Sequence, residues 1–141
     1  MSQSNLDIIQ GVYAAFSRGD IPAVLGAMSP DIRWNEAENN LPLADGNPYV
    51  GPQAVLEGVF MRLGDKFDGF SVVPERFVAD GDCVVMAGRY SATAKATGLP
   101  LNPQVVHVWT LEDGKVASFQ QHADTLGMAV ATGRVALPAS G

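Results

Sequence analysis

The chain has 141 residues, of which 47% are hydrophobic and 17% are charged, and its formal net charge is −6. This length fits one domain with a real core, and no apolar run approaches the length that crosses a bilayer. The acidic balance and the scattered Lys and Arg residues disfavour nucleic acids and anionic membrane surfaces as partners.

The single cysteine, Cys83, cannot form an internal disulfide. The first residues, "MSQSNLDII", also lack the basic region and the long apolar region of a signal peptide. We therefore expect a cytoplasmic protein. The apolar neighbours of Cys83, which are Val84, Val85 and Met86, predict a buried, inert thiol.

The start of the chain predicts a pair of helices. Ser4 and Asp7 resemble a capping box, and apolar residues then recur at helical spacing as far as Arg18. Asp20 can cap a second, shorter helix that has Pro22 in its first turn.

Alternation in residues 29–38 predicts a first strand, which places Trp34, Glu36 and Glu38 on one face. The Pro/Gly-rich loop 39–52 is long enough to form a lid or a rim. Apolar spacing then predicts a third helix over 52–63, which Gly64 could end.

The remaining half predicts an antiparallel meander and a short helix near the end of the chain. The turn signals "DGD", "TGLPLNP" and "EDG" separate the four predicted strands, which are 70–79, 83–95, 104–111 and 115–123. We expect one α+β domain over 1–141, in which three N-terminal helices cover a curved antiparallel sheet and enclose a pocket. Residues 136–141 are expected to form a flexible tail.

Four stretches, taken together in their order and spacing, resemble a known family. They are "AFSRGDIPAVLGAMSPDIRW", "YVGPQAVLEGVFMRL", "ADGDCVVMAGRY" and "HVWTLEDGKVASFQQHADT". They are similar to the SnoaL-like polyketide cyclase and ketosteroid isomerase-like branch of the nuclear transport factor 2-like superfamily. The resemblance implies a cone-shaped half-barrel, and it leaves the activity open because the superfamily contains cyclases, isomerases, dehydratases, hydrolases and members without catalysis.

The resemblance also implies candidate site residues. Glu36 matches the position of the aspartate base in ketosteroid isomerases. The oxyanion tyrosine of those enzymes matches Val12, which is one residue from Tyr13, and their second oxyanion donor, an aspartic acid, matches Val106. His107 and Asp124 are the nearest matches to the histidine and the aspartate base of SnoaL-like cyclases.

Each acidic candidate has a structural alternative. Glu36 and Glu38 act as acid or base if their strand face is buried, and are solvated if that face is exposed. Asp124 precedes a predicted helix, so its alternative role is that of a helix cap.

The histidines and aromatic residues are weighed in the same way. His107 either faces the cavity or forms a hydrogen bond within the sheet or at a dimer face. His122 either pairs with a carboxylate or lies at a rim or an interface. Tyr49 either closes over a ligand or simply packs. The expected ligand-binding residues are Trp34, Tyr49, Tyr90, Trp109 and His122.

No spacing in the sequence indicates a metal site, a phosphate loop or an acyl-transfer nucleophile, so we expect no metal and no cofactor. The favoured function is a cofactor-independent lyase or isomerase. It would remove a proton next to a carbonyl of a small, largely apolar, polyketide- or aromatic-like molecule, with Glu36, His107 and Asp124 as catalytic residues. The alternative is a non-catalytic small-molecule-binding module, and a homodimer is expected in either case.

Overall fold

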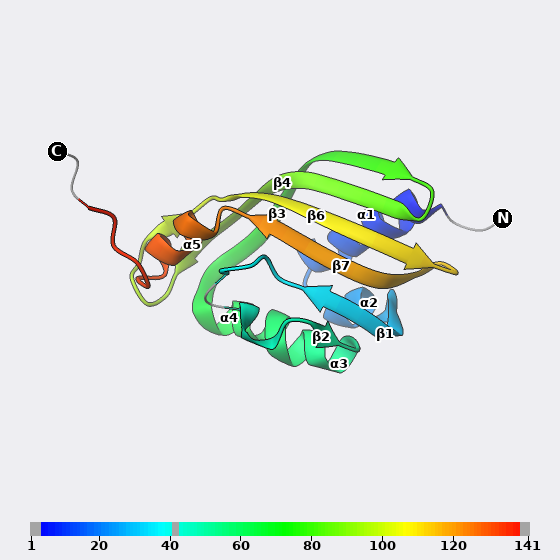
Figure 1. Cartoon of the computed structure of the whole chain (residues 1–141), viewed down its shortest axis with the longest axis horizontal. Helices are drawn as coiled ribbons and strands as arrows, with labels where there is room; N and C mark the ends of the chain where they lie inside the picture. The colour runs from blue at the N-terminus through cyan, green and yellow to red at the C-terminus, as the bar shows by residue number, and fades with distance from the viewer. Residues whose placement is uncertain (1–3, 41–42, 139–141) are drawn as a thin grey trace.

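The computed structural model in Figure 1 describes residues 4–40 and 43–138. Its helical elements are α1 (Asn5–Ser17), α2 (Ile21–Gly26), the short 3-10 turn η1 (Ala44–Gly46), α3 (Pro52–Val55), the π-helical turn η2 (Leu56–Phe60), α4 (Met61–Lys66) and α5 (Thr125–Ala131). Its strands are β1 (Met28–Asn35), β2 (Tyr49–Val50), β3 (Phe67–Asp80), β4 (Cys83–Ala94), β5 (Pro100–Leu101), β6 (Gln104–Glu112) and β7 (Lys115–Ala123). The expected α+β class is confirmed. Residues 139–141 of the predicted tail lie outside the described residues.

One mixed sheet forms the centre of the fold, in the order β2-β1-β7-β6-β4-β3, with β5 paired to β4. The meander β3-β4-β6-β7 is antiparallel, as predicted. However, β1 pairs with β7 in parallel, so the sheet departs from the expected antiparallel pairing at this one pair. A parallel pair requires a long crossover connection, and most of the chain lies between these two strands.

The two N-terminal helices begin where the sequence predicted. The Ser4 hydroxyl accepts a hydrogen bond from the Asp7 N–H at 3.1 Å, and the Asp20 carboxylate accepts one from the Ala23 N–H at 3.2 Å. The third predicted helix runs past Gly64 to Lys66, because one glycine in a helix costs only about 1 kcal/mol. None of the helices in the described ranges is both long and apolar enough to span a membrane.

The curl of the sheet creates the interior, and the helices close it from one side (Figure 1). Irregular pairing between β3 and β4, after Asp68 and after Pro74, bends β3. At Gly88 of β4 a side chain would collide with the backbone carbonyl of Val73, so this position needs glycine for the strands to approach. The inward side chains of the sheet and the helices form one buried core.

Candidate active site

A cavity lies between the inner face of the sheet and the helices, with room of about 50 Å³. Eight of its lining residues are aromatic: Tyr13, Phe16, Trp34, Phe60, Phe70, Tyr90, Trp109 and Phe119. Aliphatic side chains and Met128 line the rest, and the polar exceptions besides the two tyrosine hydroxyls are Glu36, His107 and Gln121. This space suits a few water molecules, so a larger ligand requires lining side chains to shift.

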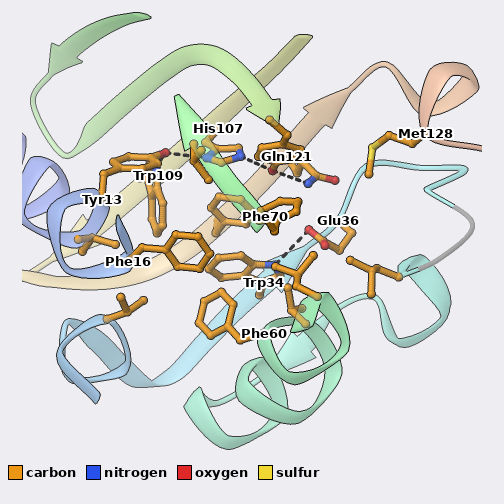
Figure 2. Close-up of a pocket in the computed structure, with 18 residues that line it drawn as sticks. Tyr13, Phe16, Trp34, Glu36, Phe60, Phe70, His107, Trp109, Gln121 and Met128 are labelled. Atoms are coloured by element: carbon orange, nitrogen blue, oxygen red, sulfur yellow. Dashed lines mark hydrogen bonds between the residues drawn. The ribbon is translucent and has the colours of Figure 1, made fainter. Parts of the chain in front are cut away.

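His107 lies in the middle of the polar side of the cavity (Figure 2). Alternation along β6 buries His107 and Trp109 on the inner face and turns Val106 and Val108 to the outer face. The Tyr13 hydroxyl lies 2.6 Å from Nδ1 of His107, and the Tyr90 hydroxyl lies 2.6 Å from Nε2. Both ring nitrogens therefore have a tyrosine partner.

Two further side chains complete this network at its ends. The Trp109 indole N–H donates to the Tyr13 oxygen at 2.9 Å, and the Gln121 amide donates to the Tyr90 oxygen at 2.7 Å. The orientation of the Gln121 amide is fixed because its oxygen accepts from the Ala37 backbone N–H at 3.0 Å. Each tyrosine oxygen thus accepts a hydrogen bond from a group that can only donate at that point.

Burial keeps these three titratable groups uncharged near neutral pH. It lowers the pKa of His107 to about 3. It raises the pKa of the Tyr13 hydroxyl, and burial followed by the charge of Glu36 raises the pKa of Tyr90 well above its usual value. The cavity therefore contains a neutral imidazole between two neutral phenols.

Glu36 supplies the carboxyl group of the cavity. It directly follows β1, is 2% exposed, and accepts a hydrogen bond from the Trp34 indole N–H at 3.2 Å (Figure 2). The Asn47 amide holds its backbone, accepting from the Glu36 N–H at 2.9 Å and donating to the Glu36 carbonyl at 2.8 Å. Burial raises the pKa of this carboxyl to about 7, although Trp34 and the charge of Arg62 act in the opposite direction. Glu36 can thus accept or donate a proton near neutral pH.

The structure brings five of the sequence-predicted site residues to this cavity: Trp34, Glu36, Tyr90, His107 and Trp109. Trp34 stacks on Phe119 with ring centroids 3.7 Å apart, so the indole that bonds Glu36 is held by packing. Glu38, two residues further along, is exposed, because the chain has left β1 and no longer alternates against the sheet.

Asp124 is not among the residues that line the cavity. Its side chain accepts a hydrogen bond from the Gly127 N–H at 2.9 Å and caps α5, which is the alternative role that the sequence allowed. The side chain is exposed and serves the helix, and the catalytic role of Asp124 stays a prediction.

Tyr49 and His122 also lie away from the cavity. The Tyr49 hydroxyl donates to the Leu43 carbonyl at 2.7 Å, so this residue packs and holds the loop that carries Leu43 into the cavity wall. His122 is exposed and lines a shallow groove on the outer face of the sheet with Arg89. The structure therefore does not bring Tyr49 and His122 to this cavity, and their ligand contacts stay predictions.

With this geometry in place, comparison with known proteins identifies the family. The family model of the SnoaL-like domain matches residues 9–119. The chain belongs to the SnoaL-like family. No curated protein matches this SnoaL-like chain.

Solved structures share the fold of this SnoaL-like protein along nearly its whole length. A nuclear transport factor 2-like protein from Burkholderia thailandensis is 34% identical with a TM-score of 0.88, covering 92% of this chain and 98% of that one. A second such protein, of unknown function, from Burkholderia pseudomallei is 28% identical with a TM-score of 0.84, covering 93% and 98%. TerC, co-crystallised with polyporic acid, is 26% identical with a TM-score of 0.82, covering 92% and 98%.

Sequence reasoning missed Tyr13 and Gln121 as cavity residues. The resemblance placed the two oxyanion donors at Val12 and Val106. In the structure, the next residue in each case, Tyr13 and His107, belongs to the hydrogen-bonded network. Tyr13 could have been found from the sequence, because it places a polar hydroxyl on the otherwise apolar face of a predicted helix. For Gln121, the signal was its place two residues after the inward Phe119 on β7.

Within residues 4–40 and 43–138, no three His, Cys, Asp or Glu side chains are grouped so that they could hold a metal ion.

Proposed function

We propose that this SnoaL-like protein is a cofactor-independent enzyme of the lyase or isomerase type. Its Glu36 carboxylate removes a proton from the carbon next to a carbonyl of a small, largely apolar molecule. A tyrosine hydroxyl of the Tyr13–His107–Tyr90 network donates to the carbonyl oxygen as negative charge develops there. The protonated Glu36 then returns the proton to the product.

The observation that carries this proposal is that a nearly buried carboxyl group and neutral hydroxyl donors line one cavity. A base works best when its pKa lies near the operating pH, and the pKa of Glu36 is raised to about 7. The aromatic side chains around both groups lower the local dielectric constant, which strengthens their interaction with a developing charge.

Deuterium exchange tests the proposal without knowledge of the natural substrate. The protein is incubated with cyclopentanone in D₂O, and NMR follows the loss of the protons next to the carbonyl. We expect the exchange to depend on the ionised form of Glu36, so its rate should rise with pH, reach half of its maximum at about pH 7 and level off at higher pH. Glu36→Gln should lower the protein-catalysed rate at least about 100-fold, the usual contribution of a general base.

Glu38→Gln is the matched control for this experiment. It makes the same chemical change two residues away, on an exposed side chain that does not line the cavity. We expect its exchange rate to equal that of the unmodified protein. Equal rates for all three proteins, at or above the buffer rate, would contradict a role for Glu36 as base.

The second candidate function is a module that binds such a molecule without transforming it. The mostly apolar lining favours it, because a carrier or sensor needs only apolar walls and few polar groups once the lining side chains shift to admit the ligand. Co-crystallisation of the 26% identical TerC with polyporic acid supports an organic ligand under either function. Binding of cyclopentanone without any exchange would favour this candidate.

We also propose a cytoplasmic homodimer that is formed through the outer face of the sheet. No helix of the described residues packs there, and the face has a row of valines that are half-buried or exposed: Val73, Val78, Val85, Val106 and Val108. Such an apolar face is typical of a self-complementary interface.

Light scattering tests the dimer and should give twice the mass of one chain. Val108→Arg places a charge on this face and should reduce the measured mass to that of one chain. Gln53→Arg, on the exposed side of α3, is the control and should leave the mass unchanged. A single-chain mass for the unmodified protein would overturn the proposal.

A further inference from the structure

The hydrogen-bonded chain through His107 contains more protons than it has acceptors. Tyr13 and Tyr90 each contribute one hydroxyl proton, and the neutral imidazole between them contributes one N–H. Two of these three protons occupy the two bonds at 2.6 Å that join the hydroxyls to the ring. The third proton must therefore point elsewhere.

The partners at the two ends do not accept this third proton. At Tyr13 the end partner is the Trp109 indole N–H, and at Tyr90 it is the Gln121 amide N–H, whose orientation the Ala37 backbone fixes. Both groups only donate, and both tyrosines line the cavity. Among the described residues, no hydrogen bond takes up the remaining hydroxyl proton, so it is free for an acceptor inside the cavity.

The tautomer of His107 decides which tyrosine holds the free proton. With the proton on Nδ1, the ring donates to Tyr13 and accepts from Tyr90, and the free hydroxyl proton is on Tyr13. With the proton on Nε2, both bonds reverse, and the free hydroxyl proton is on Tyr90.

We propose that His107 is a tautomer switch that presents one hydroxyl proton to an acceptor oxygen of the ligand, from Tyr13 in one tautomer and from Tyr90 in the other. This inference deepens the proposed function and rests on it in one respect, namely that the cavity takes a carbonyl ligand. In this role His107 is a positioning residue, because the two hydroxyls, rather than the ring, touch the ligand.

The exchange between the two tautomers is balanced in protons. Tyr13 gives its free proton to a water molecule in the cavity and takes the Nδ1 proton, while Tyr90 gives its proton to Nε2 and takes one from that water, directly or through a second water molecule, so each water ends as water. One proton leaves the network and one enters it, so the network stays neutral. The switch therefore needs no charged intermediate on His107, which agrees with its burial.

The switch predicts selection for ligands with an acceptor oxygen. A ligand oxygen beside one tyrosine accepts the free proton and stabilises the matching tautomer. An isostere in which a CH₂ group replaces that oxygen leaves the tautomer ratio unchanged. One neutral hydrogen bond shifts such a ratio by about fivefold.

The experiment uses nitrogen NMR of protein labelled with ¹⁵N in its histidine rings. The chain has only two histidines, so the exposed His122 serves as an internal reference, and His122→Asn assigns the signals. Cyclopentanone is the acceptor probe, and methylenecyclopentane is the matched probe without an oxygen. The indole N–H signals of Trp34 and Trp109 report whether a probe has entered the cavity.

We expect cyclopentanone to change the ratio of the His107 tautomers by about fivefold, and methylenecyclopentane to change it by less than twofold. A ratio that stays constant while cyclopentanone moves both indole signals overturns the switch, and so does the absence of any indole shift with cyclopentanone. The deuterium exchange assay separates the two proposals. Exchange without a tautomer change removes only the switch, and a tautomer change without exchange removes only the enzyme.

Discussion

At the residue scale, the polar groups of the cavity differ in how many of their polar atoms already have a hydrogen-bond partner in the protein. Glu36 is bonded by one indole N–H and held through its backbone by Asn47, so its carboxyl group retains the capacity to bind a ligand or a proton. His107 has a partner at both ring nitrogens, so it acts on a ligand through its two tyrosines. This division assigns proton transfer to Glu36 and oxygen recognition to the network around His107.

Asp124 provides a test at the same scale, because its two possible roles predict different results. Asp124→Ala removes the side chain that caps α5 through Gly127, and it should lower the free energy of unfolding by about 1 kcal/mol. Deuterium exchange into cyclopentanone should be unchanged, since Asp124 does not line the cavity. Urea denaturation and the exchange assay measure the two effects. A loss of exchange with unchanged stability would support the catalytic role.

Single residues also mark the limit of prediction from the sequence. Strand alternation correctly placed His107 and Trp109 on one face, and the structure shows that this face is the inner one. Asp124 and Tyr49 were harder, because an aspartate before a helix and a tyrosine in a loop fit both a site and a structural role. Only their partners in the folded chain, Gly127 and Leu43, distinguish the two.

At the element scale, the continuous helical segment from α3 to α4 contributes Val59, Phe60 and Leu63 to the lining of the cavity. Gly58, in η2, faces the Tyr49 ring so closely that a Cβ atom would collide with it, and Tyr49 in turn bonds the Leu43 carbonyl. Gly58→Ala should therefore displace Tyr49 and lower the free energy of unfolding by about 1–3 kcal/mol, despite the better helix propensity of alanine.

Gly64 in α4 offers the matched control, because a Cβ atom there meets nothing within 4 Å. Gly64→Ala should stabilise the protein by up to about 1 kcal/mol through helix propensity alone. Thermal and urea denaturation of both variants measure the contrast. Similar stabilisation by both substitutions would show that the Tyr49 contact does not hold the loop.

The elements themselves were largely predictable, whereas their pairing was less so. The limits of β7 agree with the predicted strand 115–123, and Ser4 and Asp20 begin α1 and α2 as expected. These features depend on local alternation and capping, which the sequence carries directly. The parallel pairing of β1 with β7 depends on where a distant segment enters the sheet edge, and no local pattern contains that information.

At the scale of the whole molecule, the buried site makes stability depend on pH through two opposing groups. The Glu36 carboxyl has its pKa raised to about 7, so between about pH 4.5 and pH 7 the folded state binds more protons than the unfolded state. Stability from this group therefore falls as the pH rises through that window. His107 has its pKa lowered to about 3, so the unfolded state binds more protons between about pH 3 and pH 6.5. Stability from His107 therefore rises with pH in that range.

Between about pH 4.5 and 6.5 the two contributions to the free energy of unfolding cancel in the unmodified protein. In Glu36→Gln only the contribution of His107 remains, so the free energy of unfolding should rise with pH in this range. The variant should also gain stability relative to the unmodified protein when the pH rises from 5 to 8, by an amount on the order of 2–3 kcal/mol. Urea denaturation of both proteins at these two pH values measures the gain, with Glu38→Gln as the exposed control. A stability difference that is the same at pH 5 and pH 8 would mean that Glu36 is already ionised at pH 5, and a carboxylate of that kind would be too weak a base to take a proton from carbon efficiently.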